Sequence, residues 1–344
     1  MLYYQGSDRL FLHHQTGGSY FGEWQSFGCQ KKEYENIAGI ILQQAIIMLI
    51  LNVVGMIAYY TGIVSREGGK QLSNVVLEIV TPVIIVHAYL EEEYDSRLVV
   101  NLLLTFVLAA ASYVIAILIS MLCFRGKSVG KLAPIERFSA TYSNCGFMGI
   151  PLASALFGAE GVFYVTAFLT IFFLFSWTHG VMQLTQTKDF KKALKVLRSP
   201  TVIGIAIGLI LYFVQLPMPG LLMDTMGYIS DLNTPLAMIA SGVSVAQANL
   251  LGALCTKRIY WVSFVKLLVI PLAVMAMCLC LPFVSMEVRT VVLLLTAAPA
   301  AAMCTLQCQV HGLNDIYASQ IFAATTILSM ATMPLLIQIF SMLT

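Results

Sequence analysis

The apolar stretches of this chain restrict its fold more than any other feature. About ten segments approach 20 apolar residues, the length of helix that crosses the hydrocarbon core of a bilayer. Only 10% of the 344 residues are charged, against roughly 25% in soluble globular domains. The sequence therefore predicts an all-α membrane protein that spans the lipid bilayer many times.

We expect ten transmembrane helices, five in each half of the chain. They cover residues 40–61, 71–90, 98–124, 134–156, 162–184, 202–215, 222–246, 260–282, 288–310 and 316–339. Residues 1–36 are rich in Gly, Gln and aromatic residues without the apolar core of a signal peptide. They are predicted to be a disordered tail or the product of an upstream start codon.

The basic residues orient the chain in the membrane. Thirteen of the 19 lysines and arginines fall in alternate connections, on one side of the predicted helices. The side rich in basic residues is usually cytoplasmic. Both termini are therefore predicted outside a cell membrane, and residues 185–200 are predicted to be a basic, amphipathic cytoplasmic linker.

A cluster of helix-disrupting residues interrupts the fourth apolar segment, Tyr142-Ser-Asn-Cys-Gly-Phe-Met-Gly-Ile-Pro151. Pro151 has no amide hydrogen, and glycine weakens a helix further. In hydrocarbon the freed backbone groups are costly unless protein or a wet cavity receives them. The stretch predicts a broken helix beside a binding site, and Thr296-Ala-Ala-Pro299 predicts a second.

The two halves show traces of an internal repeat. Several residues recur 153 positions apart: Gly55 and Gly208, Glu78 and Asp231, Thr81-Pro82 and Thr234-Pro235, Tyr164 and Tyr317. Five spans in each half give the halves opposite topology. Residues 37–184 and 201–344 are therefore predicted to be inverted repeats, an arrangement of many secondary transporters.

Asn144-Cys-Gly-Phe-Met-Gly-Ile-Pro151-Leu, followed by Ala155-Leu-Phe-Gly158, resembles the fourth-helix motif of the auxin efflux carrier family. Four shorter motifs also resemble that family: Thr234-Pro-Leu-Ala-Met-Ile-Ala-Ser-Gly242, Lys266-Leu-Leu-Val-Ile-Pro271, Ala298-Pro299-Ala-Ala and Met333-Pro334-Leu-Leu. The resemblance covers residues 37–344.

The resemblance implies the fold of bile-acid/sodium symporters. Helices 1, 2, 6 and 7 would form a scaffold, and helices 3–5 and 8–10 a transport core in which the broken fourth and ninth helices cross. The implied activity is elevator-type secondary transport of a small organic anion, such as auxin or a dicarboxylate. One departure concerns substrate class: Ala300-Ala-Ala-Met303 follows Pro299, where the family often has a polar residue.

The substrate-binding candidates lie at the two breaks: Asn144, Cys145, Gly146, Gly149, Pro151, Pro299, Ala300, Thr305 and Gln307. Asn144 can hydrogen-bond a substrate, or it can satisfy only the backbone opened by Pro151. Half-helices beginning at Pro151 and Pro299 would point their positive ends at the crossing. Two such ends can stabilise a carboxylate without a buried lysine or arginine, and none is predicted there.

Three ionisable residues lie deep in predicted helices. Glu78 and Asp231 could carry a proton, make scaffold contacts, or reach water from a helix end. Lys266 could attract anions, although its stem is long enough to reach the cytoplasmic face. No Cys/His set has metal-ligand spacing, and no cofactor is expected.

Other interpretations remain beside the anion carrier. A sodium-coupled, bile-acid-type symporter needs several convergent oxygens, and the ninth helix has no carboxylate in its apolar core. A membrane receptor or a channel is a third interpretation, whereas enzyme motifs and nucleic-acid-binding patterns are absent from the sequence. Coupling to protons or to sodium stays open. Gly204 and Gly208 could pack a homodimer or two helices of one chain.

Overall fold

The computed structural model describes residues 21–125, 130–186, 199–248 and 256–344. The chain divides into two compact units, Met1–Asn36 and Ile37–Thr344, and the following description concerns the second. Most of the predicted linker, residues 187–198, lies outside the described residues, as do residues 1–20 of the predicted tail.

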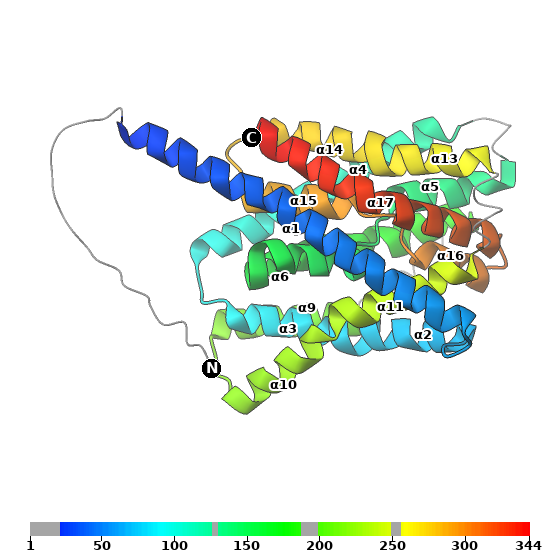
Figure 1. The fold of residues 1–344 in the computed structure, drawn as a ribbon, viewed down its shortest axis with the longest axis horizontal. Helices are drawn as coiled ribbons and strands as arrows, with labels where there is room; N and C mark the ends of the chain where they lie inside the picture. The colour runs from blue at the N-terminus through cyan, green and yellow to red at the C-terminus, as the bar shows by residue number, and fades with distance from the viewer. Residues whose placement is uncertain (1–20, 126–129, 187–198, 249–255) are drawn as a thin grey trace. The chain divides into compact units, whose positions relative to one another are not determined.

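The described residues are almost entirely helical, and none belongs to a strand (Figure 1). The helices of the first half are α1 (Phe21–Tyr60), α2 (Arg66–Val75), α3 (Thr81–Glu91), α4 (Ser96–Cys123), α5 (Ala133–Thr141), α6 (Ile150–Phe175) and α7 (Val181–Thr185). Those of the second half are α9 (Pro200–Val214), α10 (Gly220–Asp231), α11 (Asn233–Gln247), α13 (Lys257–Phe264), α14 (Ile270–Leu279), α15 (Met286–Ala297), α16 (Met303–Val310) and α17 (Asp315–Leu343). The all-α class is confirmed for these residues.

Within the described part of the chain, six helical stretches are long and apolar enough to cross a membrane: Gly39–Tyr60, Arg66–Glu91, Ser96–Cys123, Cys145–Thr185, Lys257–Leu279 and Asp315–Leu343. Pro200–Val214 is a shorter apolar helix. Helix occupies most of each of the ten predicted segments, and several of them consist of two shorter helices. The ten-span inverted repeat stays a prediction.

Three prolines directly follow a π-helical turn inside a continuous helical stretch. Pro82, Pro151 and Pro271 are each the second residue of an α-helix, respectively α3, α6 and α14. Each of these helices follows a five-residue π-helical turn: Val76–Val80, Cys145–Gly149 and Val265–Val269. A proline ring clashes with the carbonyl four residues earlier, and the wider π turn moves that carbonyl away. The helices therefore continue past these prolines.

Gly158 divides α6 into two helical parts. Its φ of 60° and ψ of −139° are not helical and lie close to a region that is almost exclusive to glycine. The part before Gly158 belongs to the predicted fourth segment, and the part after it begins the predicted fifth. A change of chain direction between these segments therefore depends on the lack of a side chain here.

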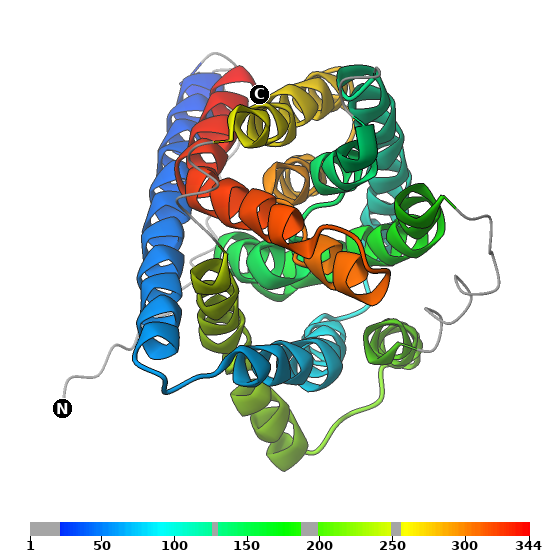
Figure 2. The ribbon, with the colours of Figure 1, turned by 90° about the vertical axis from the view of Figure 1, so that its right-hand side faces the viewer.

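The helices of Ile37–Thr344 pack in two groups. In one, α3 packs against α9 and α10, and α2 packs against α11. In the other, α15 packs against α4, α6, α14 and α17, and Figure 2 shows α15, in orange, enclosed by other helices. Contacts of α3 with α6 and of α11 with α17 connect the groups.

Glycines allow close helix contacts within this unit. A Cβ atom on Gly242 of α11 would collide with the backbone of Asn52 in α1. Gly204 and Gly208 of α9 lie against Pro82 and Tyr89 of α3. Of the two alternatives for this glycine pair, the structure shows packing within one chain.

We expect Gly242→Ala to destabilise the protein, although alanine is the better helix former. Overpacking against backbone that cannot move typically costs about 1–3 kcal/mol. Thermal unfolding in detergent should show a lower midpoint for this variant. Gly220→Ala is the matched control, because no atom lies within 4 Å of its added Cβ. Equal midpoints for the two variants would contradict the close contact.

Candidate functional site

The two interrupted helices meet through their backbones. Helix α5 ends at Thr141 and the next helical turn begins at Cys145, while α15 ends at Ala297 and α16 begins at Met303. Between them, Ser143 and Ala300 form an isolated antiparallel bridge. The Asn144 amide donates to the Pro299 carbonyl at 2.8 Å, and the Ala301 amide donates to the Tyr142 carbonyl at 2.9 Å. The interrupted segments thus satisfy part of each other's backbone.

The position of the breaks corrects the prediction based on proline. The helix does not begin at Pro151, because the π turn Cys145–Gly149 precedes it and runs directly into α6. Pro299 lies within the non-helical segment, and α16 begins four residues later at Met303. The half-helix that starts at the crossing therefore presents the amides around Cys145, and the prediction that it starts at Pro151 is wrong.

Lys266 lies at this crossing and is fully buried. Its Nζ donates to Ser143 Oγ at 2.6 Å and to the Thr296 carbonyl at 3.3 Å. Ser143 Oγ in turn donates to the same carbonyl at 3.2 Å. Among the described residues, no carboxylate lies within 4 Å of Nζ. The expectation that no buried lysine stands at the crossing is wrong, and Lys266 does not reach the cytoplasmic face.

Asn144 follows Ser143 and precedes the π turn. It is 7% exposed, and its Nδ2 has no hydrogen-bond partner among the described residues. Its side chain makes no capping bond to the following helix. The backbone opened at the break is satisfied by Pro299 instead, so the amide donor of Asn144 is left for another group.

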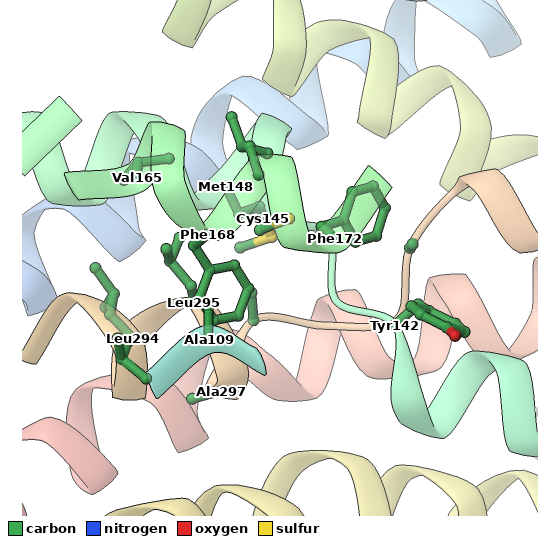
Figure 3. Close-up of a cluster of buried hydrophobic side chains, with 14 of the residues drawn as sticks. Ala109, Tyr142, Cys145, Met148, Val165, Phe168, Phe172, Leu294, Leu295 and Ala297 are labelled. Atoms are coloured by element: carbon green, nitrogen blue, oxygen red, sulfur yellow. The ribbon is translucent and has the colours of Figure 1, made fainter. Parts of the chain in front are cut away.

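The turn after Asn144 packs into an apolar cluster. Figure 3 shows the Cys145 side chain among buried neighbours that include Phe168 and Leu295. A Cβ atom on Gly149 would collide with Leu295, whereas Gly146 has only Leu169 at 4.0 Å. Cys145 and Gly149 therefore hold the turn in place, and Gly146 leaves its backbone more open.

The candidates of the second break are less closely grouped. The Ala300 amide donates to Thr325 Oγ1 at 3.2 Å, at the crossing itself. Thr305 and Gln307 lie further along α16; Gln307 is buried, and the buried Thr305 hydroxyl has no partner among the described residues. Neither side chain hydrogen-bonds to Lys266 or Asn144, so of the candidates at the second break the structure brings only Ala300 and Pro299 to the crossing.

Glu78 and Asp231 lie away from the crossing. Glu78 is exposed in the π turn Val76–Val80, and Asp231 is exposed at the last residue of α10. They belong to the packing group of α3 and α10, and they do not contact each other. Their predicted roles in proton transfer or scaffold contacts stay predictions.

Several polar residues at or near the crossing were not predicted from the sequence. Ser143, Thr296 and Thr325 contribute side-chain or backbone oxygens at the crossing. Glu136 was also missed: it is 1% exposed on α5 and accepts two bonds from Arg258, at 2.7 and 2.8 Å. A further bond to Glu136 comes from Tyr317 at 2.8 Å. The recurrence of Tyr317 in the internal repeat was the only signal in the sequence.

Comparison with known proteins identifies the family. A family model described as membrane transport protein matches residues 40–337. The chain belongs to this family of membrane transport proteins. The resemblance to the auxin efflux carrier family is thereby confirmed, and the protein is a membrane transporter.

Two archaeal proteins are similar to most of the chain. An uncharacterized transporter of Methanocaldococcus jannaschii is 24% identical over 303 residues, which is 83% of this chain and 95% of that protein. An uncharacterized transporter of Methanothermobacter thermautotrophicus is 26% identical over 299 residues, 84% of this chain and 94% of that protein. The match to the family model, over residues 40–337, includes both interrupted segments of the transporter.

We expect Glu136→Gln to destabilise the transporter strongly. A glutamine amide keeps only one acceptor oxygen, so at least one charge-assisted hydrogen bond to this buried position is lost, at a cost of about 1.5–3 kcal/mol. Thermal unfolding monitored by tryptophan fluorescence should show the loss. Glu67→Gln is the control, because Glu67 is exposed and pairs with Lys70 at 4.0 Å on the surface. Such a pair contributes at most about 1 kcal/mol. Equal shifts of the unfolding midpoint in the two variants would contradict a larger stabilisation by Glu136.

Proposed function

We propose that the transporter is a secondary active carrier of a small organic anion, a carboxylate, bound beside the crossing. The observation that carries this proposal is the ammonium group of Lys266, which is buried without a carboxylate partner among the described residues. An uncompensated charge of this kind is rare inside a membrane protein and marks a functional residue.

Electrostatics favours an anion as the missing partner. Removing an ammonium group from water costs several kcal/mol, and one hydroxyl and one carbonyl compensate this only in part. A carboxylate at 4 Å would gain about 4 kcal/mol at an effective dielectric constant of 20. Binding an anion would therefore relieve a cost that is already present in the empty protein.

Two neighbouring features support the same position. The Asn144 Nδ2 is an unpaired buried donor one residue from Ser143, which bonds to Lys266. The helical stretch that begins at Cys145 presents the positive end of its dipole at the crossing. A carboxylate could thus accept hydrogen bonds from an amide and from backbone N–H groups while it faces the ammonium.

The transport step follows from the two packing groups. The crossing residues belong to the group around α15, and the expected scaffold corresponds to the group around α3 and α9. We propose that the first group moves against the second and carries the site across the membrane. The hydrogen bond of Tyr89 to Thr166 at 2.7 Å and the ion pair of Arg66 with Asp315 at 3.7 Å connect these groups, and the movement would exchange such contacts.

A protonated Lys266 also bears on the sodium-coupled alternative. A sodium ion at the crossing would be repelled by the Lys266 ammonium, and the neighbouring oxygens already accept hydrogen bonds from that group. A receptor or channel remains the alternative from another class. A receptor or channel would show no saturable uptake, and unlabelled substrate on the opposite side of the membrane would not accelerate uptake.

We expect Lys266→Met to abolish transport and to raise thermal stability. The variant removes the partner of the anion, so saturable uptake should fall at least about tenfold. It also removes a buried, uncompensated charge, so the unfolding midpoint should rise. The assay is uptake into proteoliposomes of labelled malonate, malate and indole-3-acetate, with Lys257→Met as the control at an exposed lysine of the same helical stretch.

Two other outcomes of the Lys266→Met experiment would not fit an anion-binding lysine. If Lys266→Met transports like the wild type, the anion site is elsewhere and the proposal fails. If it loses both stability and transport, Lys266 supports the fold, and Asn144→Ala decides the case. An unchanged half-saturation concentration in that variant would overturn the site beside the crossing.

A further inference from the structure

A second candidate site is a cavity that Pro151 helps to line. A cavity of about 430 Å³ opens between α3, α10, α11 and the first part of α6. Its polar lining consists of Gln44, His87, Glu91, Ser154, Ser230, Asp231, Asn233 and Thr234. Ser143, Asn144 and Lys266 do not line it, so its chemistry is separate from that of the crossing.

The ionisable lining of this cavity is one histidine and two carboxylates. His87 Nδ1 lies 3.6 Å from Glu91 Oε2, and the histidine side chain is only 15% exposed. Gly227 of α10 lies on the Nε2 side of the ring, and Asp231 comes one helical turn after it. No lysine or arginine is among the lining residues. The elements around His87 thus present carboxylates and neutral polar groups.

Asn233 shows independently that the cavity is built to hold a polar ligand. It is 1% exposed at the junction of α10 and α11, and it lines the cavity. Neither its Oδ1 nor its Nδ2 has a hydrogen-bond partner among the described residues. A buried amide without partners is strongly unfavourable. A bound molecule that offers both a donor and an acceptor would remove this penalty.

We propose that this cavity is a proton-coupled entry site, where His87 binds one proton together with each anion and Asn233 hydrogen-bonds the anion. The inference rests on the proposed function and names the coupling ion. The proton comes from water on the side to which the cavity opens and resides first on the imidazole of His87, on α3, which stays in place. It passes to the carboxylate of the anion as the anion moves on to the crossing, and proton and anion are released together to water on the other side. Imidazole suits this role because its charge changes between pH 5 and 8.

The charge of the cavity couples anion entry to protonation of His87. An anion that enters between Glu91 and Asp231 is repelled while His87 is neutral, and protonation of His87 removes much of that repulsion. Just beyond α3, burial and the nearby Glu160 and Glu91 carboxylates raise the pKa of Glu92, in keeping with a local excess of negative charge. Because linkage is reciprocal, the anion must strengthen proton binding by the factor with which the proton strengthens anion binding.

The test is accumulation of labelled malonate or indole-3-acetate in proteoliposomes with a more acidic exterior, measured in excess of protein-free liposomes, because a neutral carboxylic acid also crosses a bilayer unaided and collects on the alkaline side. For one proton per anion, and with the membrane potential clamped to zero, the wild type should accumulate its substrate up to about tenfold per unit of pH gradient. His87→Gln should lose this accumulation more completely than it loses exchange at equal pH, because exchange needs no net proton movement. His311→Gln is the matched control, a histidine at the end of α16 that does not line the cavity.

A second measurement does not depend on a variant that folds. Adding the transported anion to wild-type protein in weakly buffered detergent should make the solution more alkaline, by up to one proton per protein. Transport without a pH response and without this proton uptake would overturn the inference and leave the proposed function standing. Accumulation that survives in His87→Gln would exclude His87 as the proton site. No saturable transport of either probe would overturn both proposals.

Discussion

The backbone pairing between the two interrupted helices is the constraint on which the site depends. Inside a membrane protein, each unsatisfied N–H or C=O group costs several kcal/mol. Tyr142 and Asn144 exchange hydrogen bonds with Ala301 and Pro299, so each break supplies the partners that the other lacks. Because these residues are far apart in the chain, the pairing also fixes how the two halves meet. It places Ser143 beside Thr296 and within reach of Lys266.

The Lys266 amine is buried at an energetic disadvantage. It bonds to a hydroxyl and a carbonyl, whereas the partly exposed Arg258 forms a complete ion pair with the buried Glu136. Proteins tolerate locally unfavourable groups where function requires them. The unpaired Asn144 and Asn233 amides show the same feature with neutral groups. These residues are the reason that we propose ligand sites at these two places.

Much of the helical arrangement could be predicted because it follows from local properties. The apolar stretches were located with boundaries close to those of the helices, and the chain does break between Thr141 and Cys145. The error concerned Pro151, because a π turn lets a helix pass a proline and no local pattern in this chain announces such a turn. Glu136 was missed for a related reason. An acidic residue near a helix start suggests a favourable helix dipole contact, whereas its partners Arg258 and Tyr317 come from the second half.

The sequence by itself determined that this chain is a multi-span helical protein with two interrupted segments, and it indicated the transporter family. Helix length, hydropathy and the backbone requirements of proline and glycine depend on residues that are neighbours in the chain, so they can be predicted from the sequence. Only the tertiary structure decided that Lys266 is buried at the crossing and that His87, Asp231 and Asn233 line one cavity. The surroundings of a charged side chain depend on which distant segments pack around it, and a lysine stem can lead equally to water or to the protein interior.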